Sequence, residues 1–177
     1  MVEDNKCGFF VIDCETDGLY GEFLTVAVVV TDENFNIINE KYWGNTKAIK
    51  EAKDPWVIEN VISHLGDFIK CESEDELFEK VWKFWIENRK NRYAIADVCF
   101  PVENRFFSEC ITKKIAERAF EGPYPLLDLS SILYAKGIDP LKERAILSNS
   151  NPLLQHNAIE DTRMIVKILK KTLGDEV

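Results

Sequence analysis

The chain has 177 residues, which is the length of one domain or at most of two very small ones. Its composition, 46% hydrophobic and 30% charged, is that of a globular protein and excludes a fibre or a largely disordered chain. The formal net charge of -9 excludes a large basic surface for duplex DNA, because duplex binding depends on neutralising phosphates. A small nucleic-acid site and a site for divalent cations both remain compatible with this charge.

We expect neither a membrane-spanning segment nor a signal peptide. The longest near-apolar run is the eight residues from Phe23 to Val30, whereas spanning a bilayer takes about 20. The polar, acidic N-terminus lacks the basic and apolar regions of a signal peptide. The five cysteines show no C-x-x-C spacing, which indicates reduced thiols. These features predict a cytoplasmic protein with no membrane partner, in which residues 1–177 form a single domain.

The first three expected elements are strands. Residues 8–15 form an apolar run that ends in acids and is typical of a central strand. A valine-rich second strand is expected over 22–31 and a weakly alternating third strand over 36–43. Because the connections between them are short, the three strands are expected to form an antiparallel meander.

Strands and helices alternate in the rest of the chain. Asp54 followed by Pro55 is typical of a helix start, and Ser73 with Glu76 forms a capping-box sequence that opens a helix. The remaining expected elements are a strand over 92–98, a helix from Pro101, an apolar segment over 125–133 that fits a strand or a helix, and a long amphipathic helix over 157–173. This order predicts an α/β fold with a mixed sheet flanked by helices.

Two carboxylates end the first strand. Alternate residues of a strand share a face, so Asp13 and Glu15 point the same way, roughly 7 Å apart along the strand. Acids at the end of an apolar strand are costly unless a positive charge holds them, and a divalent cation takes oxygen ligands. The alternative is that the strand has simply reached solvent.

A third acid lies near the C-terminus. Asn157 and Glu160 form a capping-box-like pair at the start of the last helix. Asp161 falls on the same stripe as Met164 and Ile165, a position that faces the core. His156 precedes the helix and is close enough to share a site with Asp161. The alternative is a first-turn acid beside a surface histidine.

Two more acids flank the end of the strand over 92–98. Asp97 ends this strand and Glu103 falls in the first turn of the next helix. Either side chain can point to the carboxyl ends of the strands, where α/β proteins place ligands. Strand-end capping and a favourable first-turn charge are the structural alternatives.

Together these features resemble the DEDDh group of 3′–5′ exonucleases, the DnaQ-like superfamily. Its first motif, an apolar strand followed by Asp-x-Glu-Thr-x-Gly-Leu, is matched here from Asp13 to Leu19. Its third motif, His-x-Ala-x-x-Asp, is matched from His156 to Asp161. The resemblance covers roughly residues 8–170 and implies a ribonuclease H-like fold with a five-stranded sheet, three antiparallel strands first and parallel strands after them.

The second motif of the family departs in this sequence. Where the family has His-Asn-x-x-Phe-Asp before an apolar pair, the chain has Glu103 followed by Asn-Arg-Phe106-Phe107. We expect Glu103 to be the missing metal ligand, with Asp97 as the alternative. Asp128, where relatives often carry an acid, is interpreted as structural.

The resemblance implies hydrolysis with two metal ions. Asp13, Glu15, Glu103 and Asp161 would hold two Mg²⁺ or Mn²⁺, and His156 would act as general base. The substrate would be the 3′ end of single-stranded RNA or DNA, and the product a nucleoside 5′-monophosphate. Some relatives are homodimers. Similarity assigns substrate contacts to Thr16, Gly18 and Leu19; Phe106 is a further candidate, with core packing as its alternative.

Two other functions stay open at this point. The altered second motif is also compatible with a catalytically impaired module of the same fold that binds nucleic acid or protein. The substrate could instead be a short oligonucleotide or a dinucleotide.

Overall fold

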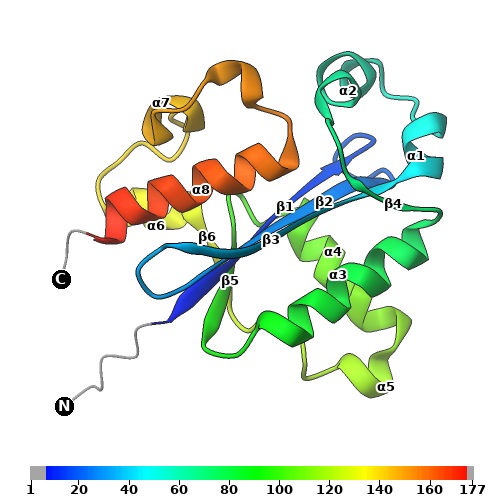
Figure 1. Ribbon diagram of the computed structural model, residues 1–177, viewed down its shortest axis with the longest axis horizontal. Helices are drawn as coiled ribbons and strands as arrows, with labels where there is room; N and C mark the ends of the chain where they lie inside the picture. The colour runs from blue at the N-terminus through cyan, green and yellow to red at the C-terminus, as the bar shows by residue number, and fades with distance from the viewer. Residues whose placement is uncertain (1–6, 175–177) are drawn as a thin grey trace.

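A mixed six-stranded sheet forms the centre of the protein in the computed structural model, which describes residues 7–174 (Figure 1). The strand order is β4-β3-β2-β1-β5-β6. Neighbouring strands are antiparallel from β1 to β3, whereas β4 is parallel to β3, β5 to β1 and β6 to β5. The strands are β1 (Gly8–Thr16), β2 (Phe23–Thr31), β3 (Ile37–Asn45), β4 (Ile69–Cys71), β5 (Arg92–Ala96) and β6 (Leu126–Asp128).

Helices cover both faces of the sheet. The core on one face is shared with α3 and α4, and the core on the other face with α6 and α8 (Figure 1). The α-helices are α1 (Thr46–Glu51), α2 (Pro55–Asn60), α3 (Glu74–Asn88), α4 (Val102–Lys113), α5 (Ile115–Arg118), α6 (Leu129–Ala135), α7 (Arg144–Ser148) and α8 (Ala158–Leu173), with 3₁₀ turns η1 (Ile62–His64) and η2 (Pro152–Leu154).

The side chains of β1 alternate between the two faces of the sheet, and this alternation decides on which face the acids at the end of β1 lie. Phe10 and Ile12 belong to the core under α3 and α4, whereas Phe9 and Val11 belong to the core under α8. Because side chains alternate along a strand, the residues after Val11 with the same parity continue toward α8. The first apolar strand therefore delivers its terminal acids to the face that α8 covers.

The expected order of elements is confirmed, with one strand more than the five expected. The additional strand, β4, has only three residues and pairs with the outer edge of β3. Three residues are too few to show a period of two, so the sequence carries no signal for this strand. The architecture is consistent with a ribonuclease H-like fold.

The apolar segment over 125–133 contains both a strand and a helix. It divides at Asp128, whose side chain accepts a hydrogen bond from the Ser131 amide at 2.6 Å and caps α6. The same carboxylate accepts from the Cys99 amide at 3.0 Å, which fixes the segment after β5. Asp128 thus makes the structural contacts expected of it.

Local signals placed several helix starts correctly. Asp54 caps α2 and Ser73 caps α3, as expected from their positions before proline and a run of acids. The short helices α1, α5 and α7 were not expected from the sequence, since each has four to six residues and little periodicity. Within the described residues, no helix has both the length and the apolar character needed to cross a bilayer.

Candidate active site

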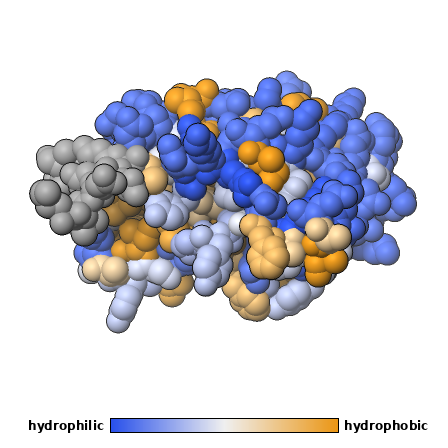
Figure 2. Space-filling model, turned by 90° about the horizontal axis from the view of Figure 1, so that it is seen from below, coloured by the Kyte–Doolittle hydropathy of each residue, from blue (hydrophilic) through white to orange (hydrophobic). Residues whose placement is uncertain are grey.

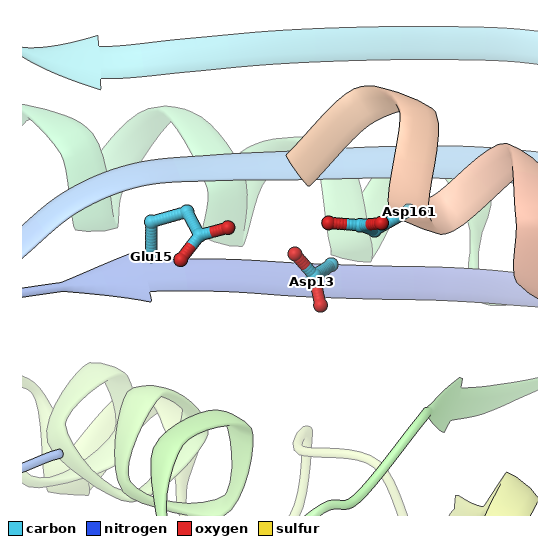
Figure 3. A group of neighbouring side chains, drawn as sticks. All are labelled: Asp13, Glu15 and Asp161. Carbon is cyan, nitrogen blue, oxygen red and sulfur yellow. The ribbon is translucent and has the colours of Figure 1, made fainter. Parts of the chain in front are cut away.

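Three carboxylates meet where β1 ends under the start of α8. One oxygen each from Asp13, Glu15 and Asp161 lies within 4.8 Å of the others. Figure 3 shows Asp13 and Glu15 rising from β1 and Asp161 descending from the first turns of α8, with the carboxylates directed toward one another. Asp161 lies almost 150 positions after Asp13 in the sequence, so the fold is what brings these carboxylates together.

Burial and mutual repulsion shape the electrostatics of this group. Burial, followed by the charge of Asp161, raises the pKa of Asp13 well above its usual value. The same two causes raise the pKa of Glu15 to about 8, and burial raises that of Asp161 to about 7. The charged side chains that act on these three pKa values are all acids. A hard divalent cation fits such a set of oxygen donors, because it supplies the positive charge that the surrounding residues do not.

Glu103 approaches the same site from α4. The pairing of β1 with β5 ends at Val11 and Ile95, and beyond it Oε1 of Glu103 accepts a hydrogen bond from the Cys14 amide at 3.1 Å. Burial raises the pKa of Glu103 to about 8, and its charge contributes to the raised pKa of Asp13 and of Glu15. Glu103 thus borders the three-carboxylate group without belonging to it.

Asp97 lies in the site but is already paired. Nε of Arg144 donates to both carboxylate oxygens of Asp97, at 2.8 and 2.9 Å. The remaining donors of Arg144 reach Ser130, Pro140 and Lys142. This guanidinium therefore ties the end of β5 to the segment between α6 and α7, and it neutralises Asp97.

His156 stands at the rim of the group. Its ring packs edge-on against Trp56, with the ring centroids 5.2 Å apart, and its backbone has a positive φ of 63°. Burial and the charge of His64 lower its pKa below the ordinary 6.5. The imidazole is therefore neutral at neutral pH and able to accept a proton.

The cap expected at the start of α8 is wrong in its detail. Asn157 occupies the N-cap position, but its side chain makes no cap hydrogen bond and instead donates to the carbonyls of His64 and Leu65, at 2.7 and 3.3 Å. Glu160 pairs with Arg163. The carboxylate that accepts hydrogen bonds from the backbone at this helix start is Asp161, which is bonded by the amides of His156 and Asn157. These bonds hold Asp161 in position toward β1.

Two adjoining hollows meet at Cys14 and Glu15. The first, about 260 Å³, contains the three-carboxylate group together with Asp97 and His156. The second, about 410 Å³, is lined by the expected substrate residues and by side chains of α2. Burial and the neighbouring Glu103 raise the pKa of the Cys14 thiol, which stays protonated between the two hollows and is no nucleophile.

The structure separates the four expected substrate contacts into two groups. Thr16, Gly18 and Leu19 line the second hollow, and Leu19 is 62% exposed. Phe106 is fully buried in the core, where its ring packs against Phe23 and Phe78. The expectation that Phe106 contacts substrate is therefore wrong, and its alternative, core packing, is correct.

Two residues of the site were not expected from the sequence. Trp56 lines the second hollow and contacts His156, although it is 54% exposed. Arg144 lines the first hollow beside Asp97. Neither carries a sequence signal, because a tryptophan in a short helix and an arginine in a polar segment resemble ordinary core and surface residues.

The fold of the chain is similar to that of nucleases of known structure. The chain matches E. coli exonuclease I in complex with a 5cy-dT13 oligonucleotide with a TM-score of 0.62 and 14% identity, over 96% of this chain and 41% of that one. A moderately thermophilic exonuclease I from Methylocaldum szegediense matches with a TM-score of 0.58 and 15% identity, over 95% and 41%. The zinc-bound complex of E. coli exonuclease I with single-stranded DNA matches with a TM-score of 0.54 and 17% identity, over 95% and 41%.

The chain shares the fold of these exonucleases. It spans about two fifths of their length. No protein-family model and no curated protein matches the sequence.

Proposed function

We propose that the protein is a metal-dependent 3′–5′ exonuclease that releases nucleoside 5′-monophosphates from single-stranded nucleic acid. The observation that carries this proposal is the convergence of Asp13, Glu15 and Asp161 within 4.8 Å beside His156. A purely structural role would not gather three partly buried acids at such short distances, because their mutual repulsion is costly without a cation.

Four carboxylates would hold the metal ions, Asp13, Glu15 and Asp161 as a group and Glu103 from its border. Two Mg²⁺ or Mn²⁺ held by these carboxylates would supply an activated water and would stabilise the leaving 3′ oxygen. Glu103 is preferred to Asp97 as the fourth ligand, since Arg144 occupies both oxygens of Asp97. Glu103 has an oxygen besides Oε1 to offer.

His156 would take the proton from the attacking water. Its lowered pKa keeps the imidazole neutral at neutral pH, and its position in the first hollow places it beside the carboxylates. The edge-on contact with Trp56 limits rotation of the ring. The chain itself would therefore contribute to catalysis by orienting His156 as the general base and by holding the carboxylates in fixed positions.

The second hollow would receive the terminal nucleotide. Leu19 and Trp56 offer exposed apolar and aromatic surface there, and Thr16 and Gly18 also line this hollow. Any base can stack on an aromatic ring, so such a site fits an exonuclease that degrades strands of every nucleotide sequence. The exonuclease I structures with bound oligonucleotide support the choice of a single strand, and the free state of all five cysteines supports a reducing compartment such as the cytoplasm.

A cleavage assay tests the proposal. Purified protein is incubated with 5′-labelled single-stranded RNA and DNA of equal sequence, in Mn²⁺, in Mg²⁺ and in chelator. We expect a metal-dependent ladder that shortens from the 3′ end and is lost in Glu15→Gln and weakened in His156→Ala. The matched control is Glu33→Gln, which removes an exposed carboxylate outside the site and should leave the ladder unchanged.

Two other results would favour the alternatives. Metal-independent binding without cleavage of any strand would indicate a binding module of this fold. Turnover of two-residue oligomers without turnover of longer ones would indicate a hydrolase of short oligonucleotides.

A further inference from the structure

A separate hollow of about 520 Å³ lies at the opposite end of the sheet from the carboxylates. It is lined by residues from the end of α3, the start of β5 and the connection from α5 to β6. These elements lie in the lower half of Figure 1. Tyr93 in this hollow pairs with Phe9 of β1, four residues before Asp13, which corresponds to roughly 13 Å along the strand. Figure 2 looks toward this end, where hydrophilic side chains cover most of the surface and apolar ones form separate groups.

Positive charge gathers in this hollow although the chain as a whole carries a net charge of -9. Arg89, Lys90 and Arg92 all line it. Arg89 is paired with the carboxylate of Glu121. Among residues 7–174, Arg92 donates only to backbone carbonyls, those of Thr31, Asn88 and Lys90.

Part of this positive charge interacts with the C-terminal end of α3. Arg89 is the C-cap of α3 and Arg92 reaches the Asn88 carbonyl, contacts that complement the negative end of the helix. Lys90 is exposed and its ammonium takes part in neither contact. Within the part of the chain that the structure describes, no carboxylate hydrogen-bonds to Arg92, so the charges of Lys90 and Arg92 are available to an anion.

Aromatic side chains border the same cations. Tyr124 is fully exposed and Tyr93 is 44% exposed, and both line the hollow. Trp85 lies at its base, held by a 2.7 Å hydrogen bond from Nε1 to the Glu121 carbonyl. Exposed rings beside unneutralised cations are the combination that binds single-stranded nucleic acid, in which bases stack on the rings and phosphates contact the cations.

We propose that this hollow is a second binding site for single-stranded nucleic acid, with phosphates at Lys90 and Arg92 and a base on Tyr124. The choice of nucleic acid over another anion rests on the proposed function. The site would hold a part of the strand away from the 3′ end that enters the carboxylate site. An acidic nuclease would gain from it an anchor for substrates that are longer than the few nucleotides its catalytic hollows admit.

Binding is measured without catalysis, so that the two proposals are tested separately. The probe is a fluorescein-labelled oligothymidylate of about 15 nucleotides, titrated by fluorescence anisotropy with the Asp13→Asn protein in chelator. Introduced into this protein, Tyr124→Ala should raise the dissociation constant about five- to a hundredfold, because a base can no longer stack at that position. Lys90→Glu should weaken binding and reduce the slope of log affinity against log salt by about 0.7 for each phosphate that the protein no longer neutralises.

The matched control is Lys83→Glu, which makes the same charge change on α3 outside the hollow. It should bind as the parent does, and circular dichroism should show the same fold for all variants. Equal affinity in the parent, Tyr124→Ala and Lys90→Glu proteins, or no binding of the probe by the parent, would overturn the second site. Loss of cleavage in the metal assay with binding that still depends on Tyr124 would overturn the proposed nuclease and leave this site standing.

Discussion

The backbone amide of Cys14 donates a hydrogen bond to Oε1 of Glu103 over 3.1 Å, although 89 residues separate them. The bond is possible because β5 stops pairing with β1 at Val11, which leaves the amide edge of β1 free at that end. A side chain from α4 then takes the place of a neighbouring strand. The end of β1 is in this way joined to the helix that carries the substituted acid of the second motif.

This contact predicts a larger role in catalysis for Glu103 than for Asp97. Glu103→Gln keeps the size of the side chain and an oxygen for the Cys14 amide, but removes the charge. We expect the cleavage rate to fall by about two orders of magnitude or more and the affinity for Mn²⁺ to fall by at least about tenfold. Rates from the ladder assay and calorimetric titration with Mn²⁺ measure the two effects.

The matching change Asp97→Asn is expected to act on stability. It leaves the largely buried Arg144 guanidinium without its carboxylate, which should lower the free energy of unfolding by about 1–3 kcal/mol. Mn²⁺ affinity should change little. The reverse pattern, with Mn²⁺ affinity abolished in Asp97→Asn and kept in Glu103→Gln, would assign the fourth ligand to Asp97.

Glu15 and the neighbouring Glu103 make the metal-free protein less stable as pH rises. The pKa values of Glu15 and Glu103 are raised to about 8, from ordinary values of 4.5. Between about pH 4 and about pH 8 the folded state therefore binds more protons than the unfolded state, so the free energy of unfolding falls with increasing pH. Thermal melts in chelator should show Tm decreasing over this window.

Two changes should reverse this loss of stability. Added Mn²⁺ should raise Tm more at pH 8 than at pH 5, because the cation replaces the missing protons. Asp13→Asn should stabilise the metal-free protein at pH 8 by about 0.5–2 kcal/mol while it abolishes cleavage. A melting temperature in chelator that is independent of pH would contradict the electrostatic account of the site.

The cleavage rate should have an acidic limb that depends on metal concentration. Below their raised pKa values, Glu15, Glu103 and Asp161 bind protons in competition with the cations. Raising the concentration of Mn²⁺ should therefore move the limb to lower pH. Initial rates across pH at two Mn²⁺ concentrations test this, and a limb that stays in place would indicate that protonation of His156 alone controls the rate.

Trp56 should affect both the base and the substrate. Trp56→Ala removes the ring against His156 and the aromatic wall of the second hollow, so KM should rise and kcat should fall. Trp56→Phe keeps an aromatic ring and should recover most of kcat. Because Trp56 is 54% exposed, the fold should remain intact in both variants, and Trp56→Ala with unchanged kcat and KM would exclude this role.

The sequence determined the identity of the site's acids through local pattern. Asp13 and Glu15 extend an apolar run of period two, so their shared face follows from strand geometry alone. Asp161 falls on the apolar stripe of α8, so its inward direction follows from helical geometry. The order of the longer strands and helices was also predictable from the sequence, because long segments show a clear hydrophobic periodicity.

Only the tertiary structure decided how these elements combine. Glu103 hydrogen-bonds to the free edge of β1, and Asp97 forms an ion pair with Arg144. The ring of Trp56 packs against His156, and Phe106 is buried in the core. Each of these outcomes depends on contacts between segments far apart in the chain, where no local pattern records the partner. The cationic hollow at the other end of the sheet has the same origin, since it needs α3, β5 and the α5–β6 connection to meet. Local periodicity therefore fixed which faces are buried, and long-range packing fixed which side chains share a site.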